Sequence, residues 1–63
     1  MIRCVIIDDE KSCREDLQSL ISVHFRDRLE VVGSCESVAE AVLRINATLP
    51  DIVFLDISMP HED

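Results

Sequence analysis

The segment IVFLD at residues 52–56 consists of four apolar residues followed by one carboxylate. A second segment of the same form stands near the start, where IRCVII at residues 2–7 runs into Asp8, Asp9 and Glu10. The segment at residues 2–7 is rich in β-branched residues and lacks polar alternation, which is typical of a central parallel strand covered on both faces. Open α/β sheets bind ligands at the carboxyl ends of their strands, so we expect a carboxylate cluster at that edge.

The residues between these two segments predict a helix followed by a strand. Apolar residues recur at three- and four-residue steps across residues 11–25 and indicate one apolar stripe on a helix. The stripe consists of Cys13, Leu17, Leu20, Ile21 and either His24 or Phe25. Residues 29–35 (LEVVGSC) predict a strand at the edge of the sheet, because they carry charge and alternate only in part. Gly33 within this strand indicates a β-bulge or a close backbone approach.

A second helix and a sharp stop precede the third strand. Ser37 and Glu40 have the spacing of a capping box, in which the serine caps the helix and the glutamate reaches back. The apolar stripe of this helix, which extends to about Ala47, consists of Val38, Ala41, Val42 and Ile45. Pro50 then disfavours helix in the residue before it. The order strand, helix, strand, helix, strand predicts an α/β domain with parallel strands and right-handed crossovers.

Composition and charge restrict the classes of function. The chain has 63 residues, which is enough for one small domain at most, and its hydrophobic content of 48% is typical of a globular chain. The net charge of -7 argues against a nucleic-acid-binding surface, which needs clustered Lys and Arg. No apolar run approaches the roughly 18–20 residues that span a bilayer, so no membrane partner is expected. Three cysteines without a C-x-x-C pair, Cys4, Cys13 and Cys35, indicate a cytoplasmic location and thiols in or near the core.

The acidic residues predict a metal site if the first and third strands are neighbours. Their carboxyl ends then lie roughly 5 Å apart, so that Asp8, Asp9 and Asp56 converge. Carboxylates so close raise each other's pKa, and a hard divalent cation such as Mg²⁺ relieves their repulsion. The cation can hold a phosphoryl group against one Asp, whose attack on phosphorus gives an acyl phosphate. The alternative is that residues 8–10 are only the polar start of a helix, but this leaves the second strand-end carboxylate unexplained.

The same residues resemble the N-terminal half of a response-regulator receiver domain of two-component signalling. The resemblance rests on the acidic run at residues 8–10 and on PDIVFLDISMP at residues 50–60, and it covers residues 1–63 as one partial domain. It implies a truncated flavodoxin-like, doubly wound parallel sheet with strand order 2-1-3. It also implies that Mg²⁺ is bound by Asp8, Asp9, Asp56 and the backbone carbonyl of Ser58, with Pro60 in the following loop.

The resemblance further implies a phosphoacceptor module rather than an enzyme. In such a module a sensor histidine kinase or a small phosphodonor phosphorylates the residue that is Asp56 here, and the receiver itself largely catalyses the transfer. Phosphorylation then shifts a two-state surface that controls an output domain. The segment VVGSCESVAEAV at residues 31–42 is most similar to regulators with a LytTR-type DNA-binding output. DNA is therefore expected as a partner only through an output domain outside these residues.

The chain matches only the first three strands and two helices of that family. The Thr or Ser and the Lys that later strands of the family contribute to the phosphoryl site have no counterpart in it. We therefore expect residues 52–55 to form an exposed apolar edge that pairs with a second copy of the chain. The alternative function is a folding and oligomerisation unit without phosphotransfer. A phosphatase of the haloacid-dehalogenase kind fits less well, because Ser58 stands where that family has a second Asp.

Overall fold

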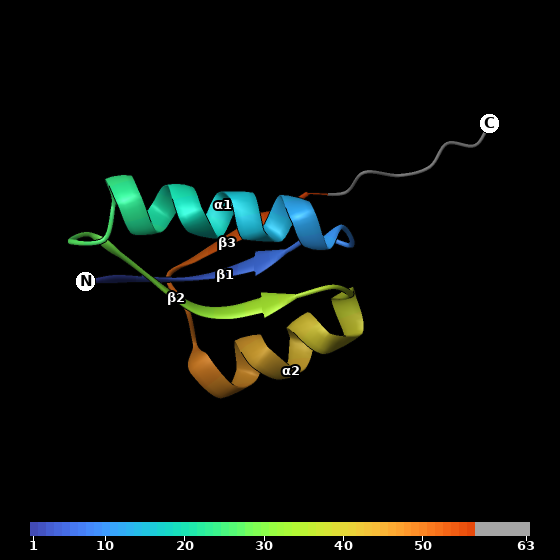
Figure 1. The fold of residues 1–63 in the computed structure, drawn as a ribbon. Coiled ribbons are helices and arrows are strands. Elements are labelled where there is room, and N and C mark those ends of the chain that lie inside the picture. Colours follow the sequence, from blue (N-terminus) through green and yellow to red (C-terminus); the bar gives the residue numbers. More distant parts are fainter. Residues whose placement is uncertain (57–63) are drawn as a thin grey trace.

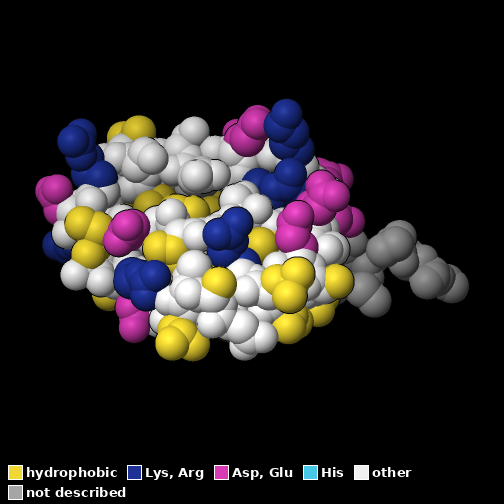
Figure 2. Space-filling model, turned by 90° about the horizontal axis from the view of Figure 1, so that it is seen from below, with side chains coloured by type: hydrophobic (Ala, Val, Ile, Leu, Met, Phe, Trp, Pro, Cys, Tyr) yellow, Lys and Arg dark blue, Asp and Glu magenta, His cyan; other side chains and the backbone are white. Residues whose placement is uncertain are grey.

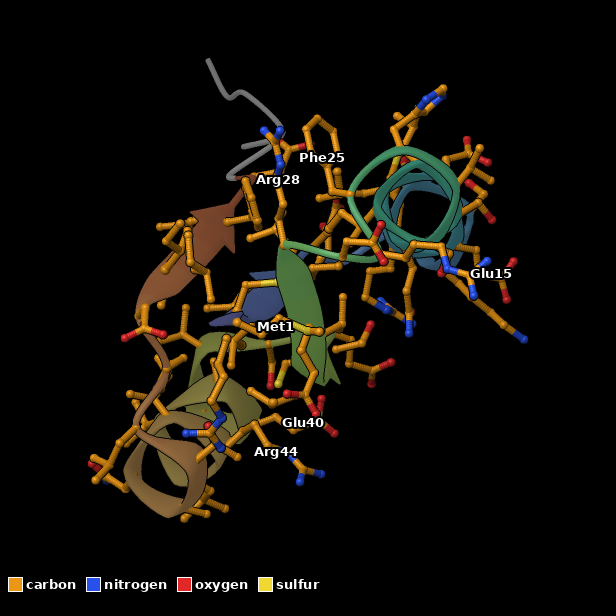
Figure 3. All side chains as sticks on the ribbon, turned by 90° about the vertical axis from the view of Figure 1, so that its left-hand side faces the viewer. Met1, Glu15, Phe25, Arg28, Glu40 and Arg44 are labelled. Atoms are coloured by element: carbon orange, nitrogen blue, oxygen red, sulfur yellow. The ribbon has the colours of Figure 1, made fainter. Side chains whose placement is uncertain are left out.

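The computed structural model describes residues 1–56, which form one parallel sheet between two helices (Figure 1). The elements follow in the order β1 (Ile2–Ile7), α1 (Lys11–His24), β2 (Leu29–Cys35), α2 (Val38–Thr48) and β3 (Ile52–Leu55). The strands are parallel and their order is β2-β1-β3. Figure 3 looks along the strands and shows α1 and α2 on opposite faces of the sheet. The predicted truncated flavodoxin-like α/β fold and its strand order 2-1-3 are confirmed.

The central strand β1 contributes to both halves of the core. Successive side chains of a strand point to opposite faces, so β1 packs against both helices. The cluster on the α2 face consists of Val5, Ile7, Cys35 and Ala41. The cluster on the α1 face consists of Cys4, Ile6 and Ile21, with Leu17, Leu29, Val31 and Phe54 partly buried against it. The unbroken apolar run at residues 2–7 therefore has the two buried faces that its composition predicts.

The strand β2 contains the predicted bulge. Cys4 pairs with Val31 and Val5 pairs with Gly33, so Val32 is one extra residue on the β2 side. The side chain of Arg44, from α2, occupies the space in which a Cβ atom on Gly33 would stand. The sequence predicted either a bulge or a close backbone approach at Gly33. The structure has the bulge, and the close approach is made by the side chain of Arg44.

Both ends of α2 follow local rules. The Ser37 hydroxyl accepts a hydrogen bond from the amide of Glu40 at 3.2 Å, which is the predicted cap. The Glu40 carboxylate accepts from the amide of Glu36 at 2.9 Å, one residue earlier than in a standard capping box. At the other end Leu49 adopts a left-handed conformation with φ 49°, which stops the helix before Pro50.

The predicted stripe of α1 is wider than the face that the sheet covers. Ile21 is buried and Leu17 is half-buried, but Leu20 and Cys13 are exposed. At 3.6 residues per turn these last two point roughly 60–80° away from the line through Leu17 and Ile21. The expectation that all three thiols lie in or near the core is therefore wrong for Cys13, whose thiol donates to the Glu10 carboxylate at 3.4 Å. The other two, Cys4 and Cys35, are buried as expected.

The stripe of α2 is also only partly covered. Ala41 is buried and Ile45 packs against it, whereas Val38 is 68% exposed and Val42 is exposed. Hydrophobic side chains are correspondingly visible on the face that α2 presents in Figure 2. The helix packs on β2 and β1, so the part of the stripe that points past these strands is largely exposed. In this part of the chain neither helix is long and apolar enough to cross a bilayer.

Candidate functional site

β1 and β3 bring two carboxylates side by side at their carboxyl ends. Ile7 pairs with Leu55 in the parallel register, so the next residues on the two strands are Asp8 and Asp56. The amide of Asp56 donates to the carbonyl of Ile7 at 3.0 Å, which continues the pairing past Leu55. The structure therefore places these two predicted site residues next to each other.

Asp8 is held through both its backbone and its side chain. Only 6% of its surface is exposed. Its amide donates to the carbonyl of Cys35, at the end of β2, at 3.0 Å. Its Oδ1 atom accepts from the amide of Glu10 at 2.9 Å, in the turn that leads into α1. Because these bonds tie Asp8 to β2 and to the start of α1, its carboxylate has a defined position beside β3.

The neighbouring carboxylates shift the pKa of Asp56. A hydrogen bond with Asp8 and the negative charge of Asp8 raise the pKa of Asp56, and burial together with the charges of Asp9 and Glu10 raises it further. The Asp56 residue itself is exposed, so the other carboxylates outweigh burial in this shift. Figure 2 shows several acidic side chains gathered at the right-hand end of the molecule. Concentrated negative charge of this kind favours a bound cation.

The other two predicted metal ligands are Asp9 and Ser58, of which only Asp9 is among the residues that the structure describes. Asp9 is exposed and acts on Asp56 through its charge. Within residues 1–56, no three His, Cys, Asp or Glu side chains lie close enough to hold a metal ion together. Ser58 and Pro60 lie outside the described residues. The pair formed by Asp8 and Asp56 supplies oxygen donors only, which fits Mg²⁺, an ion that keeps several of its waters.

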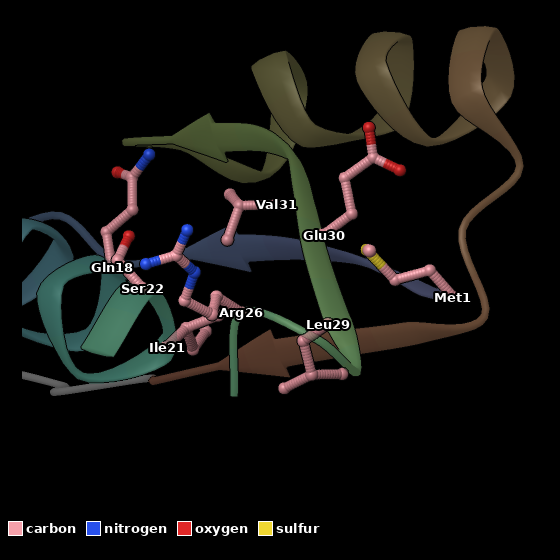
Figure 4. Close-up of a pocket in the computed structure, with 8 residues that line it drawn as sticks. All are labelled: Met1, Gln18, Ile21, Ser22, Arg26, Leu29, Glu30 and Val31. Atoms are coloured by element: carbon pink, nitrogen blue, oxygen red, sulfur yellow. The ribbon is translucent and has the colours of Figure 1, made fainter. Parts of the chain in front are cut away.

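A cavity of about 220 Å³ adjoins the two carboxylates. Its lining consists of Ile6, Ile7, Asp8, Leu17, Phe54, Leu55 and Asp56. One wall is therefore acidic, and the other walls are apolar residues of β1, α1 and β3. A second cavity of about 510 Å³ lies between α1 and β2, next to Met1 and Leu29 (Figure 4). It contains none of the predicted site residues and lies at the amino ends of the strands.

Arg14 belongs to the site region, although the sequence pattern placed it on the polar side of α1. Its Nη1 atom donates to the backbone carbonyl of Asp8 at 2.7 Å. Arg14 is half-buried, whereas the residues on either side of it along the helix are exposed. The sequence signal that could have identified Arg14 was its position four residues after Glu10, in the first turns of the helix that follows the acidic run.

Residues 4–63 match the response regulator receiver domain family. The match spans nearly the whole chain, so this chain belongs to the response regulator receiver domain family. Members of this family are signalling modules of two-component systems.

Individual proteins similar to this chain include response regulatory and transcriptional regulatory proteins. The chain is 42% identical over 61 residues to the transcriptional regulatory protein BtsR of Salmonella typhi, and 37% identical to the BtsR protein of Escherichia coli K12. It is 40% identical to an uncharacterized response regulatory protein of Vibrio cholerae serotype O1. Each match covers 97% of this chain and 25% of the relative, so the chain spans about a quarter of the length of these relatives. No solved structure matches the chain significantly.

Proposed function

We propose that this chain is the phosphoacceptor part of a two-component response regulator and that Asp56 receives the phosphoryl group. The observation that carries the proposal is the register that sets Asp56, at the end of β3, directly beside the buried Asp8. Asp56 is exposed and Asp8 is not, so a phosphodonor reaches Asp56 first. The family membership supports the same assignment.

The metal in this proposal is Mg²⁺, bound by Asp8, Asp9, Asp56 and the backbone carbonyl of Ser58. When bound, Mg²⁺ supplies positive charge that draws the phosphoryl oxygens to the acidic edge and offsets the charge that develops during transfer. Asp8 has the firmest position of the side-chain ligands because of its bonds to Cys35 and Glu10. Asp9 has to turn toward the pair for the set to close.

Asp56 acts as the nucleophile in the proposed transfer. One of its Oδ atoms forms a bond to phosphorus while the bond from phosphorus to the donor breaks. The electron pair of that bond leaves on the donor atom, which is an imidazole nitrogen of a kinase or the acetate oxygen of acetyl phosphate. Asp56 attacks as a carboxylate. A bound cation favours this charged form, whereas the neighbouring acidic residues raise the pKa of Asp56 in the free protein.

The proposed macromolecular partners follow from the family. A sensor histidine kinase is the phosphodonor, in the cytoplasm, and a DNA-binding output domain is the controlled element. Two of the relatives named above are transcriptional regulatory proteins, and this chain covers only a quarter of their length. DNA is thus a partner of the output domain and not of the acidic surface of residues 1–63.

A second copy of the chain is the proposed partner of β3. The strand lies at an edge of the sheet, and the exposed fractions of Ile52, Val53 and Leu55 are 38%, 42% and 52%. Apolar edge strands with free backbone donors and acceptors readily pair with another chain. This edge is also what favours the alternative function, a folding and oligomerisation unit without phosphotransfer.

Binding of a paramagnetic stand-in for Mg²⁺ tests the proposed site. Titration of the chain with Mn²⁺ should broaden the NMR signals of Asp8, Asp9 and Asp56 first, and excess Mg²⁺ should reverse the broadening. The variant Asp56→Asn should need a higher Mn²⁺ concentration. Broadening that begins at other acidic residues, such as Glu30 or Asp51, would contradict the proposed site.

A further inference from the structure

We propose that Arg14 is a positioning residue of the acidic site, which holds the peptide between Asp8 and Asp9 in the orientation that metal binding requires. The inference rests on the proposed function, because it concerns the same metal site. It starts from one contact: the guanidinium of Arg14 donates to the backbone carbonyl of Asp8 at 2.7 Å. This carbonyl belongs to the peptide that joins the two acidic residues.

The contact constrains the plane of the peptide unit that joins Asp8 to Asp9. A peptide unit is planar, so the orientation of the Asp8 carbonyl also sets the orientation of the Asp9 amide. The amide of Asp8 is already tied to Cys35, and its Oδ1 atom to the amide of Glu10. With Arg14 on the carbonyl, all three groups of Asp8 that can form hydrogen bonds have an identified partner.

The partner of Arg14 in this contact is a backbone carbonyl and not a carboxylate. Within residues 1–56 the one ion pair is Lys11 with Glu15 at 3.9 Å, and Arg14 takes no part in it. Its charge nevertheless reaches the end of β2. The pKa of Cys35 is raised by burial and by Glu40, and the charges of Arg44 and Arg14 partly oppose this rise. The guanidinium therefore lies over the junction between β1, β2 and the first turn of α1.

The chemistry of arginine suits this role. A guanidinium is always charged, and its donors have a fixed planar geometry that a lysine ammonium lacks. Groups that orient metal ligands from outside the coordination sphere typically change metal affinity by roughly 10–100-fold when they are removed. Removing a positive charge near a cation site has the opposite effect and strengthens metal binding, because the charge repels the metal. The two effects differ in sign, so they can be separated by experiment.

The decisive experiment measures the affinity of the chain for Mg²⁺ by titration calorimetry in three proteins. These are the unmodified chain, Arg14→Gln and the control Lys11→Gln, which removes an equal charge from the same region of α1 without touching Asp8. We expect Arg14→Gln to bind Mg²⁺ roughly 10-fold more weakly. Lys11→Gln should bind as tightly as the unmodified chain, or slightly more tightly. Equal or tighter binding by Arg14→Gln would overturn the inference, because charge alone would then describe its effect.

A second measurement needs no metal. In the metal-free protein, hydrogen exchange at the Glu10 amide, which donates to the Asp8 Oδ1 atom at 2.9 Å in the same turn, should be faster in Arg14→Gln than in the unmodified chain, and unchanged in Lys11→Gln. Arg14→Lys, which keeps a donor, should recover part of the protection. Unchanged exchange at the Glu10 amide in a folded Arg14→Gln would also overturn the inference. Failure of the unmodified chain to bind Mg²⁺ would instead contradict the proposed function, so the two failures are distinguishable.

Discussion

Asp56 stands beside Asp8 because the pairing of Ile7 with Leu55 carries on for one more residue on each strand. The buried Asp8 carboxylate, through a hydrogen bond and its negative charge, raises the pKa of Asp56. The anionic form of Asp56, the proposed nucleophile, is therefore disfavoured when no cation is present.

The first prediction concerns stability and pH. The pKa of Asp56 is higher in the folded protein than in the unfolded chain, so the folded state binds its proton more tightly. The resulting stabilisation is fully present below the ordinary Asp value of about 3.9 and is lost as pH rises through the raised pKa. Urea unfolding without Mg²⁺ should therefore show the free energy of unfolding falling across this window.

The variant Asp56→Asn tests the origin of that slope. It should be more stable than the unmodified chain at pH 7 without Mg²⁺, and its stability should depend less on pH. Asp27→Asn, in the turn at the other end of the sheet, is the matched control and should keep the slope. An equal slope in Asp56→Asn and the unmodified chain would place the coupling elsewhere.

The second prediction concerns Gly33. Gly33→Ala should lower the free energy of unfolding by about 1–3 kcal/mol, because the new Cβ enters the space of the Arg44 side chain. In the background Arg44→Ala the same change should cost little, since the obstacle is gone. A double-mutant cycle by urea unfolding measures this difference. The same cost in both backgrounds would show that Arg44 is not what excludes a side chain here.

The third prediction concerns the start of α2. Ser37→Ala should cost about 1 kcal/mol in the free energy of unfolding, because it removes the acceptor for the amide of Glu40. Ser19→Ala, on the exposed middle part of α1, should change stability by no more than about 0.5 kcal/mol. Chemical denaturation of both variants checks the prediction, and equal costs at the two serines would count against the cap.

The fourth prediction concerns the edge of β3. If a second copy pairs there, Val53→Lys should reduce self-association in sedimentation equilibrium, because a charge on the exposed strand opposes pairing. Val23→Lys, on an exposed apolar residue of α1, should leave association unchanged. A chain that stays monomeric at all accessible concentrations would contradict the proposed pairing.

Patterns within single segments predicted the elements well. The unbroken apolar run of β1 indicated a central strand, and Gly33 indicated the bulge that appears at Val32. The adjacency of Asp8 and Asp56 could be predicted because parallel strands align their carboxyl ends. Each of these features follows from a local sequence pattern or from one general rule of sheet topology, so a single sequence is enough to predict it.

Features that depend on how far one element covers another were not predictable. Periodicity marked Cys13, Leu20 and Val38 as part of apolar stripes, but periodicity does not say how wide the covering sheet is. Arg14 had the polarity of a solvent-facing residue, and its bond to the carbonyl of Asp8 depends on the path of the turn before α1. Within residues 1–56, no three His, Cys, Asp or Glu side chains come together as one metal-binding group, so the expected convergence of Asp8, Asp9 and Asp56 stays a prediction.

The most direct test of the account is the mass of the intact chain after incubation with acetyl phosphate, with and without Mg²⁺. The account predicts a Mg²⁺-dependent gain of one phosphoryl group that is absent in Asp56→Asn and retained in the control Asp27→Asn. A gain that persists in Asp56→Asn would place the acceptor on another residue. No gain in the unmodified chain, with Mg²⁺ present, would contradict phosphoacceptor function in this chain and favour a folding and oligomerisation unit.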